Sequence, residues 1–284
     1  MFTTLISAHD LLPHLNDSNF RIVDCRFNLG DTRWGETEYG NSHIPGAVYA
    51  HLDRDLSSPI IPGKSGRHPL PDTDKLVALF SSWGIETHTQ VVVYDQGAGG
   101  IAARLWWLLR WLGHDQTAVL DGGWAKWKQA GHPVSDQPFL GPGGTFTAQI
   151  RNEYIADIED FTYAKTKHAC TLIDARERPR YLGETEPIDP VAGHIPGGKS
   201  LPFAGNIGNE GYFLPPEELK NRFLEVLGNT NPEESVTYCG SGVTACHNLL
   251  AMAHAGLGMG KLYPGSWSEW ITNPERPVAV GEEV

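Results

Sequence analysis

The amino-acid sequence predicts an α/β protein built from two tandem domains of the same kind, each with a central, mostly parallel sheet flanked by helices. Three observations lead to this prediction: an internal repeat, short apolar runs typical of buried strands, and helical patterns that follow those runs. The length of 284 residues is enough for two domains of ordinary size. We therefore expect one independent core in each half of the chain.

Four segments of the first half recur in the second half in the same order. The pairs are 21–26 with 171–176, 43–46 with 194–197, 91–95 with 235–239, and 121–124 with 264–267. The offset within each pair stays between 143 and 151 residues, which chance does not produce. A stretch rich in proline and glycine separates the halves. We predict an N-terminal domain over residues 1–135, a linker over 136–152 and a C-terminal domain over 153–284.

Within each half, strand patterns are followed by helical patterns, as in a sheet of parallel strands joined by helices. The expected strands are 91–94, 119–120 and 236–238, and the expected helices are 101–112 and 244–255. A glycine follows each helix, Gly113 in the first half and Gly256 in the second, where it can end the helix in a left-handed conformation.

Composition and charge exclude several classes of protein. The net charge of -12 argues against a general nucleic-acid binder, which would need a basic surface. No apolar run is long enough for a membrane span, and the N-terminus lacks the pattern of a signal peptide. The four cysteines form no Cys-x-x-Cys pair, so we expect no metal site. We expect a cytoplasmic protein with reduced thiols.

Cys239 is the strongest candidate for a catalytic residue. It directly follows the expected strand 236–238, and ligands in open α/β sheets bind beyond such strand ends. Gly240 and Gly242 let the backbone N–H groups converge on the sulfur, and the helix after them adds its positive end. Both effects favour the thiolate, which is the nucleophilic form. The alternative is an inert, buried cysteine.

The equivalent residue of the first half is Asp95, which cannot perform thiol chemistry. The first domain is therefore expected to be non-catalytic, serving as a wall of the cleft or as a packing partner. A cysteine-dependent phosphatase is disfavoured, because Ala245 stands where such an enzyme needs an arginine to clamp the phosphoryl oxygens.

Taken together, these segments resemble the tandem rhodanese-domain sulfurtransferases over nearly the whole chain. The loop 239–245, Cys-Gly-Ser-Gly-Val-Thr-Ala, is similar to that of the 3-mercaptopyruvate sulfurtransferases. Relatives that use thiosulfate usually carry basic residues just after the cysteine, where Gly240 and Ser241 stand here. The resemblance implies two rhodanese folds, a catalytic second domain, a persulfide on Cys239 and no metal or organic cofactor.

The resemblance also implies roles for individual residues. Ser241 would take part in a proton relay with His43 and an acid near Asp31, although His43 could equally hold the turn of its His-Ile-Pro-Gly corner, as its twin His194 is expected to do. Arg180 would grip the carboxylate of the donor. The backbone of Gly240, Gly242, Val243 and Thr244 would cradle the bound sulfur.

Two features of the sequence give opposing indications of the donor. Enzymes of the mercaptopyruvate type commonly carry a second arginine shortly after the first, and the segment 184–192 contains none. The loop thus favours 3-mercaptopyruvate, whereas the arginine count leaves thiosulfate open. Two other residues are expected to have structural or regulatory roles. Arg176 is expected to be a structural ion-pair partner of Asp174. Cys246 is expected to be a buried helix residue or a disulfide partner of Cys239.

The sequence therefore predicts an enzyme that moves sulfane sulfur from 3-mercaptopyruvate to a thiol or to cyanide. Three alternatives remain: a thiosulfate sulfurtransferase, a persulfide carrier loaded by another protein, and a degenerate phosphatase-like binding domain. The expected partners are a small anionic donor and an acceptor such as thioredoxin, glutathione or cyanide. No nucleic acid or membrane partner is expected, and the chain is expected to be a monomer.

Overall fold

The computed structural model describes residues 1–157 and 170–283, which fall into two compact units. The first unit comprises 1–58, 70–151 and 209–213, and the second comprises 59–69, 152–208 and 214–284. Each unit thus contains one short segment from the other half of the sequence, which a division into consecutive halves does not anticipate. The segment expected as the linker belongs to the first unit as far as Arg151.

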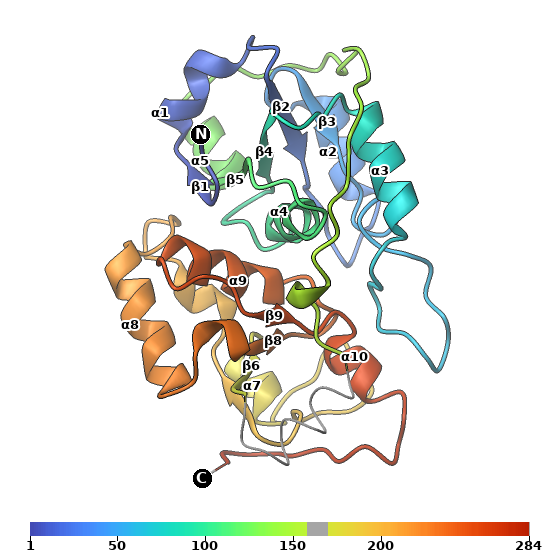
Figure 1. The fold of residues 1–284 in the computed structure, drawn as a ribbon, viewed down its shortest axis with the longest axis vertical. Coiled ribbons are helices and arrows are strands. Elements are labelled where there is room, and N and C mark those ends of the chain that lie inside the picture. The colour runs from blue at the N-terminus through green and yellow to red at the C-terminus, as the bar shows by residue number, and fades with distance from the viewer. Residues whose placement is uncertain (158–169, 284) are drawn as a thin grey trace. The chain divides into compact units, whose positions relative to one another are not determined.

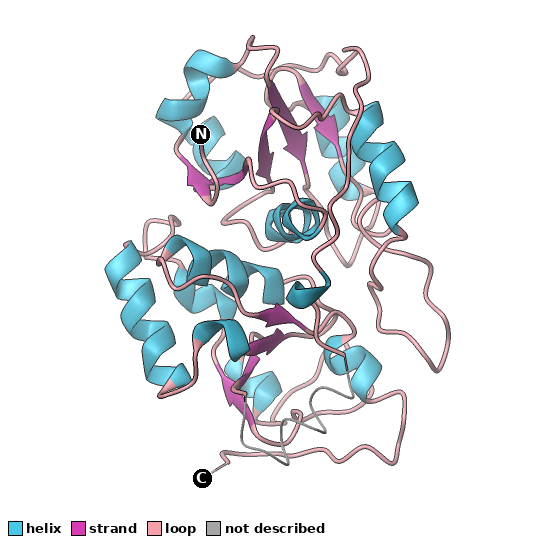
Figure 2. Ribbon diagram, in the orientation of Figure 1, coloured by secondary structure: helices cyan, strands magenta, loops and turns pink. Residues whose placement is uncertain are grey.

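The first unit is built on a five-stranded sheet in which all paired strands are parallel (Figures 1 and 2). In spatial order the strands are β1 (Leu5–Ile6), β5 (Thr117–Leu120), β4 (Gln90–Tyr94), β2 (Phe20–Asp24) and β3 (Ala47–Tyr49). Every residue of β4 is buried, as its continuous apolar run predicts for a central parallel strand.

Helices flank this sheet (Figure 1). They are α1 (Ala8–Leu11), α2 (Trp34–Asn41), α3 (Thr73–Ser82), α4 (Ala102–Trp111) and α5 (Gly123–Gln129), with a 3-10 turn at Leu12–His14. Asp72 begins α3 by accepting the N–H groups of Asp74 and Lys75, which would otherwise lack partners at a helix start. Gly113, with φ of 88°, follows the end of α4 as expected. Trp124 and Trp127 of α5 pack in the core with Val92 of the sheet.

The second unit repeats this plan on a four-stranded parallel sheet. In spatial order its strands are β7 (Gly198–Ser200), β6 (Leu172–Asp174), β8 (Val236–Tyr238) and β9 (Lys261–Leu262). The helices among its described residues are α7 (Arg178–Tyr181), α8 (Pro216–Leu227), α9 (Ala245–His254) and α10 (Ser266–Trp270), with 3-10 turns at Asn152–Tyr154, Phe203–Asn206 and Pro232–Glu234. Trp267 and Trp270 of α10 pack in the core with Val236 and Tyr238 of β8.

Both sheets carry the same buried ion pair at equivalent positions. Arg26 is bound to Asp24 and lies over the ring of Trp124, 4.5 Å from its centroid. Arg176 is bound to Asp174 and lies 4.7 Å from the centroid of Trp267. The structural role expected for Arg176 is therefore confirmed, and the internal repeat extends from the sequence to the side-chain contacts.

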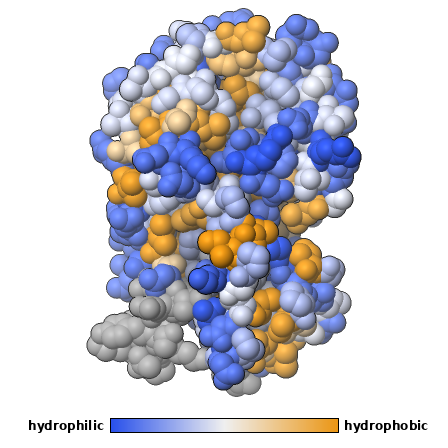
Figure 3. Space-filling view, turned by 90° about the vertical axis from the view of Figure 1, so that its right-hand side faces the viewer, coloured by the Kyte–Doolittle hydropathy of each residue, from blue (hydrophilic) through white to orange (hydrophobic). Residues whose placement is uncertain are grey.

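Hydrophilic side chains cover most of the face drawn in Figure 3, and apolar side chains gather there in separate patches. Among the helices that the structure describes, none is long and apolar enough to cross a membrane.

Candidate active site

The sulfur-bearing residue expected from the sequence lies where β8 turns into α9. Cys239 is almost completely buried and is the first residue after β8. Its carbonyl accepts the N–H of Trp267 at 3.0 Å, and the carbonyl of Gly240 accepts that of Ser268 at 2.9 Å. The start of α10 thus fixes the two carbonyls of the loop. Gly242 has φ of 75°, and a Cβ there would lie 2.2 Å from the carbonyl oxygen of Pro264, so only glycine fits.

The equivalent loop of the first unit shows what such a loop does with a negatively charged side chain. Four backbone N–H groups converge on the carboxylate of Asp95, at distances between 2.7 and 3.1 Å. They belong to Gly97, Gly99, Ile101 and Ala102. The fold therefore places an anion-binding ring of amides around the residue that follows this strand. By the internal repeat, the same position in the second unit holds Cys239.

Ser266 makes a contact with Cys239 that has no equivalent in the first unit, because the equivalent residue there has no side chain. Its hydroxyl accepts the N–H of Cys239 at 3.1 Å and donates to the carbonyl of Tyr263 at 2.9 Å. Ser266 has φ of 54°, and among the described residues it is the one non-glycine residue in that region. This conformation costs a side-chain-bearing residue roughly 1–2 kcal/mol. The equivalent residue of the first unit is Gly123, with φ of 56° and no hydroxyl.

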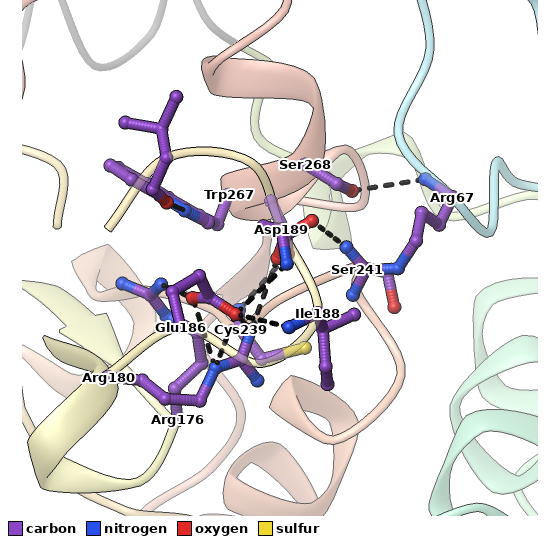
Figure 4. Close-up of polar contacts among 12 residues, drawn as sticks. Arg67, Arg176, Arg180, Glu186, Ile188, Asp189, Cys239, Ser241, Trp267 and Ser268 are labelled. Carbon is purple, nitrogen blue, oxygen red and sulfur yellow. Dashed lines mark hydrogen bonds and ion pairs between the residues drawn. The ribbon is translucent and has the colours of Figure 1, made fainter. Parts of the chain in front are cut away.

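The loop 59–69 brings two functional groups to Cys239 that the sequence reasoning missed. Its backbone is fixed to α10, because the N–H of Arg67 donates to the hydroxyl of Ser268 at 3.0 Å (Figure 4). The next residue, His68, is buried, and its Nδ1 lies 2.8 Å from the hydroxyl of Ser241. Ser241 lies two residues after Cys239, so the loop that carries the thiol also carries a hydroxyl in contact with an imidazole.

Arg180 lies in a network of buried carboxylates (Figure 4). Its Nε donates to both oxygens of Glu186 at 3.1 Å, and its Nη2 donates to Asp189 at 3.1 Å. Burial disfavours the charged form of Glu186, but the hydrogen bonds from Arg180 and from the backbone outweigh it and lower the pKa of Glu186. For Asp189, burial raises the pKa even though Arg67 and Arg180 oppose that shift.

Arg67 is the second guanidinium of this network, and it also pairs with Asp189. A Cβ built on Gly240 would lie 2.9 Å from Nη2 of Arg67 and 3.5 Å from Nη2 of Arg180. Gly240 thus leaves room for both cations to approach the residue next to the nucleophile. A second arginine thus lies near Gly240 even though segment 184–192 contains none, and it comes from the loop 59–69, more than a hundred residues earlier.

Among the interactions recorded for the described residues, neither His43 nor Asp31 contacts Ser241. The ring of His43 is buried, with Nδ1 2.7 Å from the carbonyl of Tyr39 and Nε2 2.9 Å from that of Gln137. Its twin His194 contacts the carbonyl of Tyr181 in the same way, at 2.8 Å. Asp31 is exposed, and its carboxylate accepts the N–H of Arg33.

The other predicted residues of the loop, Val243 and Thr244, directly precede α9. Val243 is buried and Thr244 is half-buried. Cys246 is buried in α9, where its thiol contacts the carbonyl of Gly242 at 3.4 Å, and none of the four cysteines forms a disulfide. In the described part of the chain, no group of three or more potential metal ligands is arranged to hold a metal ion.

One feature of the sequence hints at two of the missed residues, Arg67 and His68. Arg67 and His68 stand at the end of a stretch with glycine and proline on both sides, which is typical of an irregular loop that carries function. Glu186 and Asp189 lie in the segment 184–192, where the sequence predicts no site residue. No local pattern reveals that both stretches meet at Cys239, because that meeting depends on the tertiary fold.

Comparison with known proteins identifies the family of the chain. Residues 7–130 and 157–273 each match the rhodanese-like domain family. The two matches cover most of the chain, so the chain belongs to this family and contains two of its domains in tandem.

Individual relatives match over nearly the whole chain. It is 47% identical over 279 residues to a probable 3-mercaptopyruvate sulfurtransferase of Pseudomonas aeruginosa, covering 98% of each chain. It is 37% identical over 288 residues to a putative thiosulfate sulfurtransferase of Mycobacterium tuberculosis, covering 98% of this chain and 97% of that one.

Among solved structures, the 3-mercaptopyruvate sulfurtransferase of Leishmania major superposes with a TM-score of 0.84 at 29% identity. The match covers 97% of this chain and 75% of that one. These comparisons confirm two predictions from the sequence: the fold of two rhodanese-like domains and the enzyme class, a sulfurtransferase.

Proposed function

We propose that this chain transfers sulfane sulfur from 3-mercaptopyruvate to a thiol or to cyanide through a persulfide on Cys239. The observation that carries the proposal is the pair of guanidiniums, Arg67 and Arg180, beside Gly240. A donor that binds its carboxylate there would present its sulfur to the neighbouring residue, Cys239. The relatives named for mercaptopyruvate chemistry support the same donor.

The reaction proceeds in two half-reactions. The Cys239 thiolate attacks the donor sulfur, the S–S bond forms, and the C–S bond breaks with its electron pair leaving on carbon as the enolate of pyruvate. The enolate then takes up a proton. An acceptor such as cyanide attacks the outer sulfur, departs as thiocyanate and returns the thiolate of Cys239. Because each half-reaction starts from a covalent intermediate or ends in one, ping-pong kinetics are expected.

Proton transfer in this scheme is assigned to Ser241 and His68. The hydroxyl of Ser241 and Nδ1 of His68 are within hydrogen-bonding distance, as a proton relay requires. The relay exchanges protons with the donor thiol as it becomes the outer sulfur of the persulfide. This assignment replaces the predicted role of His43, whose two ring nitrogens both face backbone carbonyls. Asp31 is not part of the proposed relay.

Thiosulfate is the second candidate donor. A thiosulfate sulfurtransferase is among the relatives, and two guanidiniums can also bind a sulfonate group. The loop after Cys239 carries no lysine or arginine of its own, however, so the cations near the sulfur are limited to those of other segments. We place 3-mercaptopyruvate first for this reason.

We further propose a thiol acceptor, such as that of thioredoxin or glutathione, in a reducing compartment such as the cytoplasm. The four cysteines, none of which forms a disulfide, are compatible with such a compartment. A monomer suffices for the reaction, because this one chain supplies the nucleophile, the relay and both arginines.

The proposal is tested by measuring kcat/KM for 3-mercaptopyruvate and for thiosulfate with cyanide as the acceptor in both assays. A preference for 3-mercaptopyruvate is the expected result. A preference for thiosulfate would assign the chain to the second donor. Turnover of neither donor, together with acceptance of sulfur from another persulfide protein, would instead make the chain a sulfur carrier.

A further inference from the structure

The two arginines proposed to bind the donor already share a carboxylate of the protein. Asp189, whose side chain is only 3% exposed, accepts from Nη2 of Arg180 and pairs through its other oxygen with Nη1 of Arg67 (Figure 4). Asp189 thus occupies both guanidiniums at the place where a donor anion is expected. The following inference rests on the proposed function, because it concerns the choice of donor at that same site.

Charges around this position balance. The cations are Arg67, Arg176 and Arg180, and the anions are Asp174, Glu186 and Asp189. Four of these six form pairs that exclude Arg67. Asp174 binds Arg176, and Glu186 binds Arg180 and lies 3.4 Å from Arg176. Asp189 is the carboxylate that neutralises the one arginine coming from the loop 59–69.

Arg67 nevertheless keeps hydrogen-bonding capacity for a ligand. Its Nε is buried and has no hydrogen-bond partner among the described residues, while its Nη2 points to the space beside Gly240. A buried guanidinium N–H without a partner is costly, and Nη2 of the same guanidinium lies where it can reach an anion bound next to Gly240. The site therefore accepts an anion, but in the presence of a fixed negative charge.

We propose that Asp189 determines donor specificity by disfavouring dianionic donors relative to monoanionic ones. 3-Mercaptopyruvate binds through a single carboxylate charge, whereas thiosulfate carries two charges on a compact ion. Coulomb repulsion from Asp189 scales with the charge of the donor. If the repulsion lowers binding of a monoanion by some factor, it lowers binding of a dianion at the same place by about the square of that factor.

The first test is Asp189→Asn, which removes the charge and keeps the shape of the side chain. We expect kcat/KM to rise roughly 10-fold for 3-mercaptopyruvate and roughly 100-fold for thiosulfate, as one and two charges near a partly buried carboxylate imply. A fall for both donors would mean that Asp189 serves to position the arginines. An equal rise for both would mean that it does not discriminate by charge. Either result overturns the proposal.

Asp115→Asn is a matched control. Asp115 is also a carboxylate shared by two arginines, Arg110 and Arg151, but it belongs to the first unit and to no part of the proposed site. It changes the net charge by the same amount, so unchanged donor constants are expected. If Asp189→Asn does not fold, Asp189→Ser removes the same charge with a smaller side chain and is judged by the same two ratios.

A binding experiment separates this proposal from the proposed function. The experiment uses a Cys239→Ala background, in which no sulfur can be transferred. The affinities for thiosulfate and for pyruvate are measured by calorimetry in two variants, one with Asp189 and one with Asp189→Asn. Asn should tighten thiosulfate binding by clearly more than pyruvate binding. Equal changes would overturn the role of Asp189, whatever the turnover assays show. Failure of the wild type to turn over either donor would count against the proposed function alone.

Discussion

The immediate surroundings of Cys239 determine what this thiol can do. The hydroxyl of Ser266 accepts the backbone N–H of Cys239, and the N–H groups at the start of α10 donate to the carbonyls of Cys239 and Gly240. His68 contacts the hydroxyl of Ser241, two residues along the chain. Each contact comes from a segment distant in sequence. The reactivity of the residue is therefore a product of the assembled second unit and not of the loop 239–245 alone.

The assignment of the relay to His68 can be tested against the alternative from the sequence. His68→Asn should lower kcat by roughly 100-fold or more, because general acid–base groups typically contribute factors of this size. His43→Asn should leave kcat within a few-fold of the wild type and should instead lower Tm, since it disturbs contacts to two backbone carbonyls. The reverse pattern would restore His43 to the relay. Steady-state kinetics and thermal unfolding of both variants provide the comparison.

Ser266 has a strained backbone conformation, and we expect this conformation to place its hydroxyl where it positions the backbone of Cys239. Ser266→Gly removes a strained side chain, worth roughly 1–2 kcal/mol, and leaves the N–H of Cys239 without its acceptor, at a cost of similar size. Stability should therefore change little, while kcat falls roughly 10-fold and KM stays near its original value. Ser266→Ala keeps the strain without the hydroxyl and should lower both Tm and kcat. A wild-type kcat in Ser266→Gly would contradict this role.

At the scale of elements, the two strand-loop-helix units around Asp95 and Cys239 differ in one instructive way. The first loop has one more residue between its strand and α4 than the second has between β8 and α9. A Cβ on Gly123 would lie 2.0 Å from the carbonyl oxygen of Gly97, so the longer loop fills the space that Ser266 uses in the second unit. The shorter loop thus makes room for the serine that contacts the nucleophile.

These elements also show how far sequence reasoning reaches. The strand 236–238 and the helix after it could be predicted, because apolar patterns and a terminal glycine are local signals. The contact between His68 and Ser241 spans 173 residues and has no local signal. The repeat drew attention to His43, whose equivalent His194 makes the same contact to a backbone carbonyl, so the repeated motif indicates a structural corner. By contrast, the residues proposed to act in sulfur transfer occur in the second unit and have no equivalent of the same type in the first.

At the scale of the whole molecule, the chain combines a negative net charge with a small group of arginines beside Cys239. The net charge of -12 repels an anionic donor at long range, whereas Arg67 and Arg180 act at short range. Added salt screens the long-range repulsion first. We therefore expect kcat/KM for an anionic donor to rise as ionic strength increases from low values towards about 0.15 M. A steady fall over that range would show that the local cations dominate the approach of the donor.

The two copies of the fold in this chain are expected to have different roles. Both copies contain the buried Asp–Arg pair and a tryptophan ring beside its arginine, so these contacts belong to the part of the structure that the two copies share. The first copy holds a carboxylate in its ring of amides, and the second presents a thiol at the equivalent place. Sulfur chemistry is consequently expected in the second copy alone.

The central claim is that Cys239 carries the transferred sulfur, and the mass of the intact protein tests it most directly. The wild type is incubated with 3-mercaptopyruvate without an acceptor, and then with cyanide. The account predicts a gain of one sulfur atom that cyanide removes, and no gain in Cys239→Ser, whose fold is unchanged by circular dichroism. A sulfur adduct on Cys239→Ser, or none on the wild type with either 3-mercaptopyruvate or thiosulfate, would contradict it.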